Sequence, residues 1–178
     1  LPKPVGEVGG GILNAIVGTL MLIAVSTLLS VPIGVFAAIF LSEYRKGRLV
    51  YLVRLSIEIL QGIPSIVFGI IAYVWIVVVV GSFSALSGGV ALAMMMLPVI
   101  ITAAEETLKL IPDSLREASL ALGVSYPRTI LKVVLPAGLS GILTGILLSV
   151  GRVAGETAPL LFTAFGSPFM NFNILKPV

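Results

Sequence analysis

The sequence predicts an all-α membrane protein, a multi-pass helical bundle of about four spans that forms one transmembrane domain over residues 1–178. Three observations lead to this fold class. Hydrophobic residues make up 58% of the chain and charged residues only 11%, whereas soluble domains carry about 25% charged residues. The mean hydropathy is +1.17. The apolar residues also gather into long runs, which are expected to be helices because an isolated strand leaves backbone groups unpaired in lipid.

The first half of the chain contains two of the expected spans. Residues 11–41 are long for a single span, and a kink at Pro32, a tilt or a projection beyond the bilayer would accommodate the extra length. Residues 49–60 are mixed, with Arg54 and Glu58 at the i, i+4 spacing of one helix face. The QGIPS segment then breaks the pattern, and the apolar residues 66–80 form the second span.

The second half of the chain supplies the other two spans. A short uncharged turn over residues 81–89 leads to the third span, residues 90–104. Residues 105–128 form a polar loop, and residues 129–150 are expected to be the fourth span. The segment after Ala158–Pro159 is mixed and is expected to be external or re-entrant.

Basic residues are concentrated in two segments between spans. Residues 43–54 and 105–132 hold eight of the 11 basic residues, namely Arg45, Lys46, Arg48, Arg54, Lys109, Arg116, Arg128 and Lys132. The positive-inside rule predicts that both segments lie in the cytoplasm. The pI of about 9.5 therefore reflects membrane topology and does not indicate nucleic acid binding.

The composition excludes several kinds of enzyme. The chain has no cysteine and no histidine, and Asp113 is its single aspartate. A Ser–His dyad, a thiol nucleophile and a pair of aspartates are therefore impossible within these residues. The sequence also lacks the Gly-rich phosphate loop of ATPases. We predict no catalytic residue, no cofactor site and no metal site.

The polar loop contains the segment EASLALGVSYPRTILKVVLP, residues 117–136. The apolar spacing over Ser114–Leu122 indicates a short helix, with Asp113 or Ser114 as a candidate cap and Arg116 facing water or a partner. Gly123 suits the left-handed residue that ends a helix, and a second helix is expected to begin near Tyr126–Pro127. The pattern predicts a helix–glycine–helix elbow at the membrane surface.

This segment resembles the cytoplasmic EAA loop of bacterial ABC importer permeases. The family pattern is E-A-A, three residues, G, nine residues and I-x-L-P, from which Ser119 and Val133 depart conservatively. The resemblance implies that the loop is a coupling helix seated in a cytosolic nucleotide-binding ATPase subunit, which hydrolyses the ATP. The alternative is a solvated loop without a partner. The coupling residues that it implies are Arg116, Glu117, Ala118, Ser119, Gly123, Leu135 and Pro136.

A second informative segment is GRVAGETAPLLFTAFGSP, residues 151–168. Arg152 and Glu156 are four residues apart near the outer end of the fourth span, where we expect them on one helix face. A charge deep in lipid costs at least ~2.5 kcal/mol, so these side chains should face protein or a polar cavity. The guanidinium suits bidentate binding of phosphate oxygens, and the alternative is an interhelical salt bridge. Thr157 and Ser65 could donate hydroxyl groups to an anion or serve as packing and capping residues.

The segments GETAPLL and PSIVFG, with EYRKGRLVYLVR near residue 50, resemble the permease of the phosphate-specific ABC importer. The resemblance implies a bacterial inner-membrane subunit that moves inorganic phosphate. Its implied partners are a second permease subunit, with a heterodimer expected, an extracytoplasmic phosphate-binding protein and membrane lipid. Thr102 departs from the pattern, since family members often carry arginine there. The family usually has further helices, so the chain is expected to be part of a longer one. The rival functions are a permease for another oxyanion such as sulfate and an ATP-independent anion carrier or channel.

Overall fold

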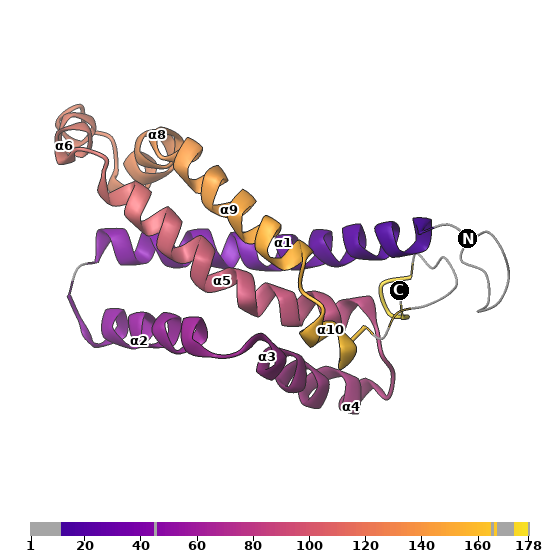
Figure 1. The fold of residues 1–178 in the computed structure, drawn as a ribbon. Helices are drawn as coiled ribbons and strands as arrows, with labels where there is room; N and C mark the ends of the chain where they lie inside the picture. The colour runs from indigo at the N-terminus through magenta and orange to yellow at the C-terminus, as the bar shows by residue number, and fades with distance from the viewer. Residues whose placement is uncertain (1–11, 45, 165, 167–172, 178) are drawn as a thin grey trace, which may run out of the picture.

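The computed structural model describes residues 12–44, 46–164, 166 and 173–177. Every regular element in these residues is helical, which confirms the all-α prediction. The elements shown in Figure 1 are α1 (Leu13–Glu43), α2 (Arg48–Gly62), α3 (Ser65–Ala72), the π-helical η1 (Tyr73–Val77), α4 (Val78–Val80), α5 (Ala85–Lys109), α6 (Asp113–Ala121), α7 (Tyr126–Thr129), the π-helical η2 (Ile130–Val134), α8 (Leu135–Ala137), α9 (Leu139–Ala154) and α10 (Ala158–Leu161).

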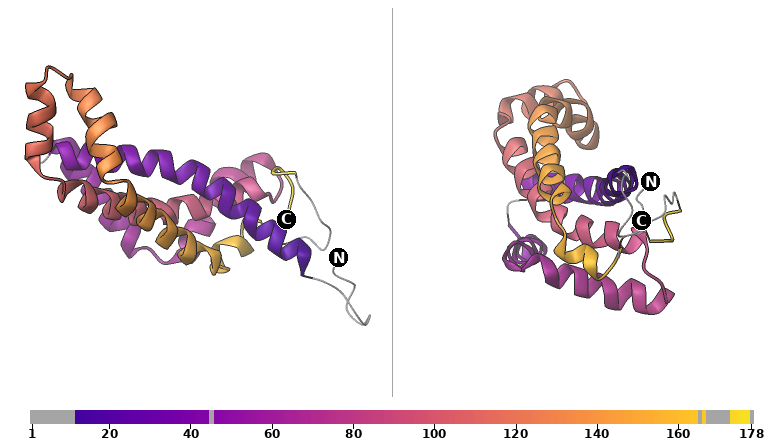
Figure 2. Two further views of the ribbon diagram at one scale, coloured as in Figure 1. Left: turned by 90° about the horizontal axis from the view of Figure 1, so that it is seen from above. Right: turned by 45° about the vertical axis from the view of Figure 1, so that its right-hand side comes forward.

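Helices α1 and α5 lie side by side and form the centre of the bundle (Figures 1 and 2). Glycines let them approach closely, since a Cβ on Gly89 would meet Val25 Cγ1 at 2.4 Å and one on Gly34 would meet Ile100 Cγ2 at 2.8 Å. The structure also shows that the turn predicted over residues 81–89 is shorter than expected. Helix α5 already begins at Ala85, so the second half of that predicted turn is helix.

Two helices, α1 and α5, are long and apolar enough to cross a membrane. Helix α1 continues over 31 residues with Pro32 inside it. The other two expected spans belong to bent pairs. The helix Arg48–Gly62 meets Ser65–Val80 at 108°, and Tyr126–Ala137 meets Leu139–Ala154 at 66°. The described residues therefore contain up to four spans if each bent pair is one span.

The predicted fourth span, residues 129–150, lies within the bent pair Tyr126–Ala137 and Leu139–Ala154, so it is interrupted and not one straight helix. The π-helical turn η2, Pro136 and the break at Gly138 all fall within it. Proline has no N–H for the helical ladder, and its ring clashes with the preceding turn. A π-helical turn also shifts the register of the backbone hydrogen bonds. The local backbone chemistry thus bends this segment between α8 and α9.

The two ends of the bundle hold different sequence segments. One end gathers α6, α7 and the connection between α1 and α2, and the other holds the α4–α5 turn and α10 (Figure 1). At the second end, the Ser84 N–H donates to Thr163 O at 3.0 Å and the Ala85 N–H donates to Lys176 O at 3.1 Å. These bonds satisfy N–H groups that a helix start leaves unpaired. Thr163 and Lys176, two described residues after α10, therefore lie against the start of α5.

Candidate functional site

The elbow begins with α6, which has almost the predicted bounds, and Gly123 ends it with a φ of +77°. The Gly123 N–H donates to Leu120 O at 2.9 Å and the Val124 N–H donates to Ser119 O at 3.3 Å. This pair of bonds is a Schellman motif, which closes a helix on a left-handed residue. The left-handed glycine and the start of α7 at Tyr126 are both confirmed.

The predicted cap at the start of α6 is wrong. The residue before the helix is Pro112, and no side-chain capping bond occurs there. Asp113 is already the first helical residue, and its carboxylate accepts from Arg116 Nη1 at 3.2 Å. Pro112 itself has φ −58° and ψ 137°, so its ring fixes the backbone that leads into the helix.

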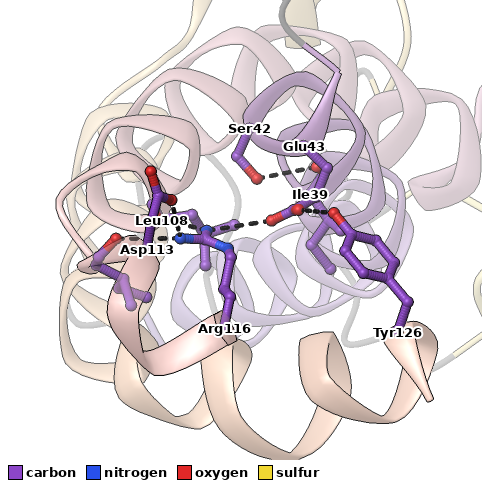
Figure 3. Close-up of polar contacts among 8 residues, drawn as sticks. Ile39, Ser42, Glu43, Leu108, Asp113, Arg116 and Tyr126 are labelled. Atoms are coloured by element: carbon purple, nitrogen blue, oxygen red, sulfur yellow. Dashed lines mark hydrogen bonds and ion pairs between the residues drawn. The ribbon is translucent and has the colours of Figure 1, made fainter. Parts of the chain in front are cut away.

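Arg116 lies inside the elbow, so the expectation that it faces water or a partner is wrong. Its side chain is 13% exposed. The guanidinium donates to Leu108 O at 3.3 Å, in the last turn of α5, and to Ile111 O at 3.1 Å, just after that helix. It also pairs with Glu43 Oε1 at 3.1 Å, at the end of α1 (Figure 3). The last carbonyls of a helix lack intrahelical partners, and Arg116 supplies donors to them.

The second arm of the elbow is held by hydroxyl groups. Tyr126, the first residue of α7, donates its hydroxyl to Glu43 Oε2 (Figure 3). Ser119 Oγ and Thr129 Oγ1 lie 2.9 Å apart, and both residues are buried. These two contacts join α6, α7 and α1 at one end of the bundle.

The seven predicted coupling residues divide between two faces. Arg116 and Ser119 point into the elbow, and Leu135 packs against the apolar core. The other four are exposed, namely Glu117, Ala118, Gly123 and Pro136. Beside them, Leu122 is 84% exposed at the tip of the elbow.

The predicted substrate residues Arg152 and Glu156 do not share a helix face. Helix α9 ends at Ala154, so only Arg152 is on it, in its last turn. Arg152 is exposed, and no ion pair joins it to Glu156 in the part of the chain that the structure describes. Glycine at position 155 ends the helix, which sequence spacing alone did not reveal.

Glu156 and Thr157 instead line a cavity of about 260 Å³. Thr19, Leu22 and Ile23 of α1 form another wall of this cavity. Arg152 and Ser65 are not among its lining residues. The structure thus brings two of the four predicted substrate residues together.

The two segments PSIVFG and GETAPLL are neighbours in the fold. Ser65 is half-buried and begins α3, which packs against α10. A Cβ on Gly69 would lie 2.6 Å from Pro159 Cα, so the two backbones are nearly in contact. Only glycine permits this approach.

A charged seam between α2 and α5 was missed from the sequence. Glu105, which is 6% exposed, pairs with Arg54 and with Lys109, each at 2.5 Å. Nearby, Gln61 Nε2 donates to Thr102 Oγ1 at 3.2 Å. Glu105 was expected in the loop, but α5 continues to Lys109 and places it in the helix. The i, i+4 spacing of Glu105 and Lys109 was the available signal.

Comparisons with known proteins agree with this architecture. Residues 30–176 match the family model described as binding-protein-dependent transport system inner membrane component. A chain of the MetNI methionine ABC transporter, in an inward-facing conformation, matches with a TM-score of 0.76 and 26% identity, over 84% of this chain and 72% of that one.

Curated relatives at higher identity bear the name phosphate transport system permease protein PstA. The Yersinia pestis protein is 45% identical over 100% of this chain, which spans 61% of that relative. The Haemophilus influenzae protein is 41% identical over 95% of this chain, which spans 60% of that relative. These matches confirm the resemblance carried by the elbow and by GETAPLL. The chain belongs to the family of binding-protein-dependent transport system inner membrane components.

Proposed function

We propose that this chain is the core of a membrane subunit that moves inorganic phosphate across the bacterial inner membrane, driven by ATP hydrolysis in a partner subunit. The carrying observation is the similarity, at 45% and 41% identity, to relatives named as phosphate transport permeases. The helix-rich membrane fold and the elbow support the same function.

The outward face of the elbow is the proposed docking surface for a cytosolic nucleotide-binding ATPase. Glu117 and Ala118 are exposed on α6, and the exposed Leu122 offers apolar area at its tip. An apolar side chain at a polar, solvent-facing turn gains most by burial against a protein partner. The inward residues Arg116 and Ser119 keep this surface in a fixed shape.

The proposed orientation puts the elbow in the cytoplasm. The α1–α2 connection and α6 lie at the same end of the bundle (Figure 1). The longer segments that contain them, residues 43–54 and 105–132, hold eight of the 11 basic residues, and Arg116 of the second pairs with Glu43 of the first. Basic segments beside spans favour the cytoplasmic side. The opposite end, with α10 and the α4–α5 turn, would then receive phosphate from an extracytoplasmic binding protein.

We place the phosphate pathway along Arg152, Glu156, Thr157 and Ser65. The exposed guanidinium of Arg152 offers a fork of donors to a phosphate. Glu156 in its cavity would accept a hydrogen bond from a protonated phosphate. A few helices do not enclose a pathway, so a second permease subunit, different in sequence, would complete it within the lipid.

Uptake of radiolabelled phosphate by cells that express the full-length transporter tests this proposal. We expect energy-dependent uptake that excess unlabelled sulfate does not suppress. Suppression by sulfate would overturn phosphate as the substrate and favour another oxyanion. Uptake that persists without ATP would overturn the ATP-driven mechanism and favour a carrier or channel.

A further inference from the structure

The carboxylate of Glu43, the last residue of α1, is the point at which the elbow meets the membrane bundle (Figure 3). Its Oε1 lies 3.1 Å from Arg116 Nη2, and its Oε2 accepts the Tyr126 hydroxyl. The two donors come from opposite arms of the elbow, α6 and α7. The Glu43 side chain is 8% exposed. Both oxygens of one buried carboxylate are therefore used to hold the elbow.

Arg116 extends this contact to α5. The same guanidinium that pairs with Glu43 donates to the carbonyls of Leu108 and Ile111. Arginine carries five donors in a planar fork, so one side chain can bind three groups in fixed directions. Lysine, with a single ammonium group, has no such geometry. Arg116 thus joins the ends of α1 and α5 to α6.

The elbow itself is braced internally. The Schellman motif at Gly123 sets the angle between its arms, and the Ser119–Thr129 hydrogen bond of 2.9 Å ties α6 to α7. Hydrogen bonds therefore connect α6 to α7 and, through Arg116 and Tyr126, connect both arms to Glu43. Networks of packed and hydrogen-bonded groups carry coupling in this way.

Helix α1 leads from Glu43 to the cavity of Glu156 and Thr157. It continues unbroken from Leu13 to Glu43, and its Thr19, Leu22 and Ile23 line that cavity. At 1.5 Å per residue, Leu22 and Glu43 are about 30 Å apart along the helix axis. One helix therefore joins the elbow at one end of the bundle to the predicted substrate residues at the other.

We propose that Glu43 is a positioning residue that transmits movement of the ATPase-bound elbow to α1, and through α1 to the cavity at Glu156 and Thr157. The proposal rests on the proposed docking of an ATPase at α6. Glu43→Gln keeps the size of the side chain but leaves one oxygen acceptor for two donors. The variant should fold and assemble while the link between the elbow and α1 is weakened.

The test uses the full transporter reconstituted in proteoliposomes, with the phosphate transported per ATP hydrolysed as the readout. We expect this ratio to fall about fivefold or more in Glu43→Gln and in Tyr126→Phe, within the usual range of coupling energies. Basal ATP hydrolysis and the amount of assembled complex should not change. The matched controls are Glu58→Gln and Tyr51→Phe, exposed residues of α2 that receive the same chemical changes. An unchanged ratio would overturn the proposal, as would a parallel loss of transport and hydrolysis.

A second measurement separates failure of the link from failure of phosphate as substrate. Thr19→Cys places a thiol at the cavity, in residues that otherwise contain no cysteine. The rate of its modification by a thiol reagent should change when ATP and vanadate trap the ATPase, and should cease to change when Glu43→Gln is added. This readout needs no transported substrate. An equal response with and without Glu43→Gln, or no response in either, would overturn the proposed transmission.

Discussion

At the residue scale, some side chains of the elbow point into it and others face outward. Arg116 directly precedes the segment that resembles a docking motif and Ser119 lies within it, yet the hydrogen bonds of both residues are internal. Glu117 and Ala118, between them, are exposed. Since residues 116–119 lie in one helical turn, neighbours along the chain point in different directions. One helical turn therefore contributes both to the shape of the elbow and to the exposed face that we propose as a docking surface.

Gly123→Val should abolish phosphate uptake while the protein still inserts into the membrane. A left-handed backbone at φ +77° costs an L-residue about 1–2 kcal/mol, and more for a β-branched one. A Cβ at this position would meet no atom within 4 Å, so the cost is in the backbone and not in packing. Uptake and the amount of protein in isolated membranes are the two measurements.

The control for this variant is Gly123→Asn, because asparagine tolerates the left-handed region. It should keep most of the uptake. Normal uptake by Gly123→Val would remove the elbow from the coupling mechanism.

Arg152→Lys should reduce phosphate transport by about tenfold, the equivalent of one charge-assisted hydrogen bond of about 1.5 kcal/mol. Lysine keeps the charge but loses the bidentate fork. Assembly of the transporter, measured by co-purification of its subunits, should be unaffected. Arg128→Lys, at an exposed position of α7, is the matched control. Transport that survives Arg152→Lys would remove this residue from the proposed phosphate pathway.

At the element scale, close contacts at glycine decide how the short helices are placed. Gly69 lets α3 reach the backbone of Pro159 in α10, and Gly89 lets α5 reach α1. The sequence did not predict these contacts, because the spacing of glycines does not indicate which helix packs against them. The bend between α8 and α9 belongs to the same scale, since Pro136 precedes it.

Gly69→Ala should destabilise the contact between α3 and α10. The added Cβ would lie 2.6 Å from Pro159 Cα and 2.8 Å from its carbonyl oxygen, and backbone atoms cannot swing aside. Overpacking of this kind costs about 1–3 kcal/mol. Thermal unfolding of the purified full-length protein in detergent measures the loss.

Gly62→Ala is the control, because a Cβ there would meet nothing within 4 Å. It should leave the unfolding temperature unchanged or slightly raised. Equal stability of the two variants would mean that α10 can move away from α3 at no cost.

At the scale of the whole molecule, the two ends of the bundle have different characters. One end holds the basic connections and the elbow, and the other holds α10 and the uncharged turn after Gly81 (Figure 2). The centre is the packed pair of α1 and α5, of which α5 is the more buried helix. In the Arg54–Glu105–Lys109 seam between α2 and α5, each charged side chain has an oppositely charged partner.

The topology can be measured with single cysteines, since these 178 residues contain none. We expect Ser82→Cys, in the turn before α5, to react with a membrane-impermeant maleimide applied from the outer side of the membrane. Lys46→Cys, between α1 and α2, should react only after the membrane is permeabilised. Both positions are exposed, which makes them a matched pair. The reverse pattern would contradict the proposed orientation of the elbow.

The sequence by itself determined the membrane class, the elbow with its left-handed Gly123, and the family, because composition and local spacing are properties of neighbouring residues. It did not determine that Glu43 holds Arg116, 73 residues away, or that Arg54 pairs with Glu105, 51 residues away. It also did not reveal that α9 ends before Glu156. These ion pairs and this helix end depend on which helices pack together, because a buried charge pairs with an opposite charge that the tertiary structure places beside it.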